Sequence, residues 1–379
     1  MKPKRILFCT LGYEPSPVGG AERQARLQAE ELTRRGHIVE VVSPRWRGTR
    51  TERVCGIRVN RLPRIDRRPF RTITYLPVLF VWLLVNLRRF DIVHVHLANL
   101  QVDIVALAQR PRRVPTFVKV AAGGPRGELA RMNRVAWATR YRGIRTADSV
   151  QALSSEIERE LVAVGVPPGR IVRIPNGLRT DIFRPATSSE RRAAREALGL
   201  PLDDLIVLWA GRFAQYKGVQ DLTAAWAALT PTRPAVLVLV GEPAVDAPIG
   251  PLPLLPRMVL KPWTTGIEQY YRAADIYVHP SHADGMPNVV LEAMGCGLAV
   301  IATRVAAVPD MIDDQRTGLL VDIGAVEQLR RSIELLISEA GLRRSLGSAA
   351  ARRVTETYSI ARVVDLIEAQ YGAIVEARG

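Results

Sequence analysis

The chain has 379 residues, 47% of them hydrophobic and 6% aromatic, which is too long for one ordinary core and suits two domains. Its three cysteines are scattered and form no CxxC pair, which argues against a disulfide framework or a zinc site and favours a reducing cytoplasm. Residues 1–185 hold 34 Lys and Arg against 15 Asp and Glu, a net +19, whereas residues 186–379 hold 19 against 22, so the first half is expected to meet an anionic partner.

Two apolar segments of the first half raise the question of membrane targeting. The run that follows Arg5 stops at Gly12, which is too short for a secretory signal and indicates a buried first strand. The longest run, Ile73–Leu87, contains Pro77 and is shorter than the ~20 residues that a membrane-spanning helix needs. We therefore expect no transmembrane segment there.

Short apolar runs alternate with helical segments along almost the whole chain. In the first half, a helix is expected at Ala21–Arg35, and strands are expected at Lys4–Leu11, His37–Ser43, Asp91–Leu97, Thr116–Val120, Val150–Ser154 and Ile171–Ile174. A polar helix, Ser188–Leu198, then precedes strands at Leu205–Ala210, Ala235–Val240, Asp275–Val278, Ala299–Ala302 and Gly318–Val321. This alternation predicts an α/β fold with two doubly wound parallel sheets, in Rossmann-like domains 1–184 and 185–359.

Gly19 and Gly20 stand between the first expected strand and the first expected helix. Glycines at such a position let backbone amides at a helix N-terminus approach a phosphate. A simple tight turn is the alternative, because the GxGxxG and P-loop motifs are both absent.

The segment Gly211–Gly218 follows the expected strand Leu205–Ala210. Arg212 lies at the end of this strand, and Lys217 lies at the start of the next helix. Two fixed cations there could neutralise a leaving diphosphate without a metal ion. No two aspartates are spaced D-x-D, the usual metal–diphosphate holder. Two isolated surface cations are the alternative.

The segment 279–300 is the most specific, because a strand ends, a Gly/Pro loop turns and an apolar helix begins near Asn288. Backbone amides there would face an anion at the helix N-terminus. Glu292, one turn inside, would accept hydrogen bonds from a ribose diol, and Asp284 would project toward a sugar. The loop and first helical turn add these expected donor-binding residues: Gly285, Met286, Pro287, Asn288 and Val289.

Together these segments resemble the family 4 retaining glycosyltransferases of the GT-B fold. The similarity extends, in the right order, to Gly19-Gly20, Asp91–His96, Asn176-Gly177 with Phe183–Pro185, and Thr317–Leu320. It implies two domains that face each other across a cleft, with a last helix, within 360–379, that packs back on the first domain.

The same resemblance implies the chemistry. Arg212 and Lys217 would hold the donor diphosphate, Glu292 the nucleotide ribose, and Asp284 the donor sugar. The enzyme would be a metal-independent retaining hexosyltransferase that takes a UDP- or GDP-sugar as co-substrate and needs no cofactor. Asp284 replaces the longer Glu of the family, so the identity of the donor sugar cannot be inferred.

A second departure concerns the first domain, where Ala121 stands in place of a histidine of the family. Lys119, or the amides of Gly123 and Gly124, would then stabilise the donor or an anionic acceptor. His94 and His96 alternate along one strand and share a face. We expect a buried His94 and an acceptor-side His96 at the cleft rim rather than a metal pair.

The arginines of residues 61–89 flank the long apolar run. A buried helix with solvated ends is one interpretation, and an interfacial segment in which Phe70, Tyr75 and Trp82 reach lipid headgroups is the other. The charge asymmetry favours a cytoplasmic protein held peripherally on the anionic inner face of the membrane. The expected acceptor is a hydroxyl of a glycan or a lipid-linked molecule, in the synthesis of cell-surface polysaccharide or glycolipid.

Three other functions stay open. A GT-B nucleotide-sugar epimerase or hydrolase would use the same donor site. A nucleic-acid-binding protein would explain the basic charge, but no helix-turn-helix or zinc motif is present, and aromatics do not interleave with the basic runs. An inactive scaffold protein would explain the absent histidine. The donor base and sugar, the acceptor and the linkage are not determined by the sequence.

Overall fold

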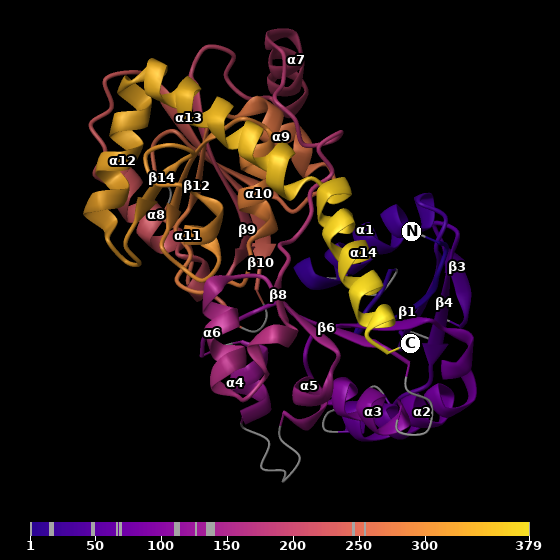
Figure 1. Cartoon of the computed structure of the whole chain (residues 1–379). Coiled ribbons are helices and arrows are strands. Elements are labelled where there is room, and N and C mark those ends of the chain that lie inside the picture. Colours follow the sequence, from indigo (N-terminus) through magenta and orange to yellow (C-terminus); the bar gives the residue numbers. More distant parts are fainter. Residues whose placement is uncertain are drawn as a thin grey trace. The chain divides into compact units, whose positions relative to one another are not determined.

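The computed structural model of the chain describes residues 2–14, 19–46, 50–65, 67, 70–109, 114–125, 127–133, 141–244, 247–253 and 255–378. The chain divides into two compact units (Figure 1). Unit 1 comprises Met1–Gly177 and Ile360–Gly379, and unit 2 comprises Leu178–Ser359. The boundary falls after Gly177, earlier than the expected position at 184, and the C-terminal helix belongs to unit 1.

Unit 1 contains an eight-stranded sheet of order β3-β4-β2-β1-β5-β6-β7-β8. All neighbouring strands are parallel except the hairpin of β3 and β4. The strands are β1 Arg5–Cys9, β2 Ile38–Pro44, β3 Glu52–Val54, β4 Ile57–Leu62, β5 Ile92–His96, β6 Thr116–Val120, β7 Ser149–Ala152 and β8 Ile171–Arg173. The six expected strands are present. The hairpin was missed because charged and polar residues interrupt its short apolar positions.

Helices α1 and α14 pack against each other and share one core with the sheet of unit 1 (Figure 1). Their buried residues, such as Ala29 and Tyr371, meet Phe8 and Phe117 of the strands. The helices of unit 1 are α1 Gly20–Arg34, α2 Phe70–Asn86, η1 Leu87–Arg89, α3 Leu100–Gln109, α4 Glu128–Asn133, α5 Arg142–Thr146, α6 Ser155–Ala163, η2 Pro168–Arg170 and α14 Ile360–Glu376.

Unit 2 contains a six-stranded, fully parallel sheet of order β11-β10-β9-β12-β13-β14. Its strands are β9 Leu205–Phe213, β10 Ala235–Pro243, β11 Met258–Pro262, β12 Ile276–His279, β13 Ala299–Thr303 and β14 Leu319–Val321. Its helices are α7 Ser188–Leu198, η3 Gln215–Lys217, α8 Val219–Ala227, α9 Ile267–Ala273, α10 Asn288–Gly295, α11 Val308–Met311, α12 Val326–Ser338, α13 Ala340–Arg353 and the π-helical turn η4 Val354–Tyr358. Strand β11 was not expected, because Lys261 and Pro262 shorten its apolar run.

Helix α2 corrects one expectation about the interfacial segment. Tyr75 is buried, and Trp82 is half-buried beside Phe90, with ring centroids 6.5 Å apart. Phe70, by contrast, is 51% exposed. Tyr75 is five positions from Phe70, which places the two residues on different faces of a helix with 3.6 residues per turn. The three aromatic residues therefore cannot reach one surface together.

Candidate active site

The first part of the site in unit 2 is the turn that follows β9. Strand β9 extends to Phe213, so Arg212 lies within it and is exposed, and its Nη2 donates to the hydroxyl of Tyr216 at 2.9 Å. Gly218 then starts α8 in the left-handed region at φ 64°, and a Cβ there would lie 1.8 Å from the carbonyl oxygen of Pro280. Only glycine fits this position, which fixes where the preceding Lys217 stands.

Lys217 forms an ion pair with Asp284, which lies 67 positions later in the chain. Nζ of Lys217 donates to Oδ2 of Asp284 at 2.6 Å, and Nε2 of His279 lies 3.2 Å from the same oxygen. Burial alone would raise the pKa of Asp284, but the Lys217 cation and His279 outweigh it and hold that pKa below its usual range. Burial lowers the pKa of His279, so its ring is neutral at pH 7. The carboxylate is therefore charged and oriented.

The loop that carries Asp284 is held from both sides. The hydroxyl of Thr303 donates to the carbonyl of Ser281 at 2.5 Å, and the amide of Ala307 donates to the carbonyl of Gly285 at 3.2 Å. The amide of Gly285 also donates to Oδ1 of Asp284 at 3.0 Å. The loop thus presents its aspartate from a fixed backbone.

Helix α10 begins at Asn288, as expected, with Pro287 as its N-cap. The first amides of such a helix have no partner within it, and the positive end of its dipole attracts anions. Glu292 lies one turn inside and is buried, and its Oε2 accepts a hydrogen bond from the hydroxyl of Tyr271 at 3.1 Å. Met286 is buried, whereas Val289 is partly exposed at the start of the helix.

The glycine pair of unit 1 stands at the start of α1, with Gly19 as its N-cap. The amide of Gly19 donates to Oε2 of Glu22 at 3.0 Å, so a carboxylate of the protein already caps this helix. This arrangement corresponds to the tight-turn alternative for Gly19, while Gly20 is the first helical residue. Residues 15–18 of the preceding loop lie outside the described residues.

Lys119, on β6, is fully buried, and its Nζ donates to Oδ1 of Asn176 at 2.8 Å. Glu128, the first residue of α4, accepts from the amides of Ala98 and Ala121 at 2.7 and 3.0 Å and so joins the loops after β5 and β6. Burial lowers the pKa of Lys119 to about 7, and burial raises the pKa of Glu128 to about 7. At the position of the expected histidine, Ala121 thus offers only its backbone amide, which donates to Glu128.

In unit 1, residues that were expected on the acceptor side contact protein groups. The amide of Gly124 donates to Oε1 of Glu160 at 2.6 Å, so it already has an anionic partner, and a Cβ on Gly123 would lie 2.9 Å from Ile157. His96 is buried rather than at a rim, because its ring stacks on that of His94 with centroids 4.0 Å apart. Gly124 and His96 therefore contact protein groups, and their role toward a ligand stays a prediction.

Comparison with known proteins identifies both units. Residues 19–177 match a family described as a glycosyl transferase 4-like domain, and residues 204–339 match the family of glycosyl transferases group 1. The D-inositol 3-phosphate glycosyltransferase of Mycobacterium tuberculosis is 32% identical over 238 residues, which are 59% of this chain and 48% of that protein. The chain therefore matches about half the length of this curated relative.

The chain belongs to the family 4 glycosyltransferases.

Solved structures agree on the fold. Sucrose-phosphate synthase from Thermosynechococcus elongatus superimposes with a TM-score of 0.80 at 21% identity, covering 99% of this chain and all of that one. HepE from Anabaena, solved with UDP and glucose, superimposes with a TM-score of 0.78 at 17% identity over 98% of this chain and all of that one. The two parallel α/β sheets match the GT-B fold.

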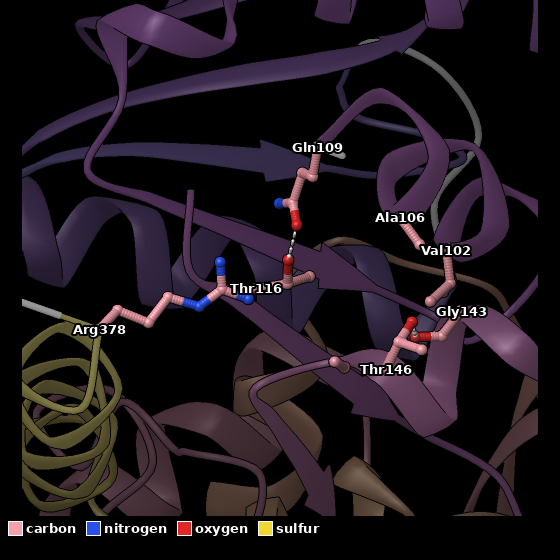
Figure 2. Close-up of a pocket in the computed structure, with 8 residues that line it drawn as sticks. Val102, Ala106, Gln109, Thr116, Gly143, Thr146 and Arg378 are labelled. Carbon is pink, nitrogen blue, oxygen red and sulfur yellow. Dashed lines mark hydrogen bonds between the residues drawn. The ribbon is translucent and has the colours of Figure 1, made fainter. Parts of the chain in front are cut away.

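A cavity of about 180 Å³ lies in unit 1 at the amino end of β6, the end opposite to Lys119 (Figure 2). Figure 2 shows Gln109 and Arg378 near Thr116, whose hydroxyl donates to the Gln109 carbonyl at 2.7 Å. Ligands of parallel sheets bind at the carboxyl ends of the strands. This cavity is therefore separate from the candidate site.

Two kinds of feature are absent among the described residues. In that part of the chain, no three His, Cys, Asp or Glu side chains gather as metal ligands would. No helix among the described residues has both the length and the apolar character for crossing a membrane.

Several contacts of the glycosyltransferase were missed from its sequence. Tyr216 and His279 lie inside the motifs already singled out, but only the folded loop shows that they bind Arg212 and adjoin Asp284. Tyr271 is an ordinary aromatic residue of a helix, which predicts a core position. Nothing local indicated that Glu128 would bind two distant amides.

Proposed function

We propose that this chain is a retaining glycosyltransferase, which moves a sugar from a nucleotide-sugar to a hydroxyl of a glycan or a lipid-linked acceptor in the synthesis of cell-surface polysaccharide or glycolipid. The observation that carries the proposal is the Lys217–Asp284 ion pair at the end of β9, beside the start of α10. A donor diphosphate would be neutralised by Lys217 and Arg212 and by the positive end of α10. The UDP complex of the similar HepE supports a nucleotide donor.

The chemistry that these residues supply is stabilisation of a leaving diphosphate. Charge develops on the phosphate oxygens as the bond to the sugar breaks, and fixed cations stabilise that charge without reorganising. Because Lys217 and Arg212 are permanently in place, we propose that no divalent metal is needed. EDTA should therefore leave turnover unchanged. Glu292 would bind the ribose hydroxyls, and Asp284 would lie at the donor sugar.

The proposal is tested with the full chain and a panel of UDP-, GDP- and ADP-sugars. Slow hydrolysis of one nucleotide class in the absence of acceptor is expected, and ¹H NMR of the released sugar should show the donor's own anomeric configuration first. Release of the opposite anomer would contradict a retaining mechanism. Absence of hydrolysis with every donor would count against the function. Epimerised donor would instead favour the epimerase.

Membrane attachment is the second part of the proposal, because one face of α2 is both apolar and exposed. This face carries Phe70, Pro77, Val81 and Val85, whose spacings of seven, four and four positions place them on one side of the helix. The side chains of Val81 and Val85 are 60% and 74% exposed. Arg88 is exposed where the helix ends. An apolar face next to arginines suits an anionic bilayer surface.

The experiment is co-sedimentation of the full chain with vesicles of anionic and of zwitterionic lipid. Binding to anionic vesicles at low salt, reduced at high salt, is expected because counterions screen the arginines. A protein that stays in the supernatant with anionic vesicles at low salt would overturn membrane attachment, and the donor assays would be unaffected by that result.

A further inference from the structure

Near the carboxyl ends of four neighbouring strands of unit 1, polar residues stand side by side. In the sheet, His96 pairs with Lys119, and Lys119 pairs with Gln151. Phe8 pairs with His94 and Cys9 with Val95, so Thr10, which directly follows β1, stands beside His96. Alternate residues of a strand share a face, so Thr10, His96, Lys119 and Gln151 form one row at the carboxyl end of the sheet. We call these four residues the polar row.

The polar row lies on the face of the sheet that α1 covers. The ring of His96 packs on Phe8 with centroids 4.4 Å apart, and Phe8 belongs to the core that includes Ala25 and Ala29 of α1. Gln28, between those two alanines, is fully buried. A polar side chain of the helix is thus buried on the same side of the sheet as the polar row.

The polar row and Gln28 are buried, each at most 2% exposed, yet most of their polar atoms lack a protein partner. Among the described residues, no hydrogen bond is made by Oγ1 of Thr10, either ring nitrogen of His96, Oε1 of Gln151 or the amide of Gln28. Each such buried group costs free energy when it stays unpaired. An unpaired group in a native protein is commonly satisfied by a ligand or by internal water.

Lys119 gives the polar row its charge. Its Nζ donates to Oδ1 of Asn176 at 2.8 Å, and among the described residues the charge of Glu128 acts on it without forming an ion pair with it. A buried cation is stable when an anion completes it. Hydroxyl, imidazole and amide groups beside a cation suit an oxyanion that also carries hydroxyls.

We propose that the polar row, together with Gln28, binds an oxyanion such as the phosphate of the acceptor, with Lys119 as its cation. This inference rests on the proposed transferase function, and it specifies the acceptor class that the function leaves open. The phosphate ester and free inorganic phosphate share this chemistry. The row would position the acceptor, while Arg212 and Lys217 hold the donor.

The test uses inorganic phosphate as the probe and the full chain saturated with UDP, so that the donor site is occupied. Calorimetry should detect one phosphate per chain, and Lys119→Met should weaken its affinity by about tenfold or more, as expected for a lost charged hydrogen bond. Thr10→Val keeps the side-chain shape, removes an unpaired hydroxyl and should weaken phosphate severalfold. Neither variant should change the affinity for UDP.

The matched control is Lys217→Met, which should lose UDP and keep phosphate. Equal phosphate affinity in wild type, Lys119→Met and Thr10→Val would overturn the proposal and leave internal water as the occupant of the row. Absence of phosphate binding to the UDP-loaded chain would overturn it as well. Should UDP itself fail to bind, the proposed function fails, and the comparison of phosphate binding between wild type and Lys119→Met still decides the polar row.

Discussion

The two units treat their charged groups in opposite ways. In unit 2, Lys217, Asp284 and His279 meet within hydrogen-bonding distance, and the loop around them is held by backbone contacts. In unit 1, Lys119 is buried among polar atoms that mostly lack protein partners. Unit 2 thus holds its charged groups in place without a ligand, whereas in our proposal the polar row of unit 1 is completed by an oxyanion.

Removal of the lysine of unit 2 should produce the largest effect. Lys217→Met takes away a fixed cation at the proposed diphosphate and should lower turnover by about 100-fold or more. Lys261, whose Nζ donates to the carbonyl of Leu198 at 3.1 Å, offers a control in the same unit, and Lys261→Met should leave turnover nearly unchanged. Rates of donor hydrolysis in the two variants check this prediction. Equal rates would contradict a special role of Lys217 in unit 2.

The turn that positions Lys217 can be tested with two glycines of the same conformation. Gly218 and Gly199 both have φ 64°, but a Cβ at Gly218 meets Pro280 at 1.8 Å, whereas a Cβ at Gly199 meets nothing within 4 Å. Gly199→Ala should cost about 1 kcal/mol for its left-handed backbone. Gly218→Ala should cost about 3 kcal/mol, because backbone must also move. Urea unfolding measures both, and similar costs would contradict the close contact.

The buried lysine of unit 1 should make stability depend on pH. Burial lowers the pKa of Lys119 to about 7, so between pH 7 and 9 the unfolded chain holds a proton that the folded chain has released. The free energy of unfolding should therefore rise with pH in that window, by about 2 kcal/mol from this group. Lys119→Met should lose this rise. Parallel pH profiles for wild type and variant would show that the lysine stays charged.

The outer face of α2 should give the smallest effect. Val85→Glu places a negative charge in the exposed apolar face and should weaken binding to anionic vesicles by about tenfold, with stability changed by less than ~0.5 kcal/mol. Val162→Glu is the control, since Val162 is 47% exposed on α6 of the same unit. Co-sedimentation measures both variants, and equal losses would mean that net charge alone governs binding.

The sequence predicted unit 2 better than unit 1 for a physical reason. Arg212 lies near the end of β9, Lys217 lies in the turn after it, and Glu292 lies on the first helix after β12. Local pattern determines the placement of all three. Long-range pairing determines the rest. Strand register sets Lys119 beside Gln151, and the Glu160 carboxylate accepts the hydrogen bond of the Gly124 amide. Both contacts join residues that no local pattern relates.

Helix α2 shows the same limit on a smaller scale. Its existence was predicted from the apolar run, but a helix that is apolar all around does not show which side meets the core. The interfacial interpretation placed Tyr75 outside and it lies inside, whereas Val81 and Val85 are the exposed residues. The alternation of strands and helices, by contrast, predicted both parallel sheets.

The most direct test of the account is calorimetric titration of the full chain with UDP, GDP and ADP. We predict that one of these nucleotides binds to wild type and to Lys261→Met at one site per chain, and that Lys217→Met abolishes this binding. Failure of all three to bind, or wild-type affinity in Lys217→Met, would contradict the claim that unit 2 holds a nucleotide-sugar through Lys217.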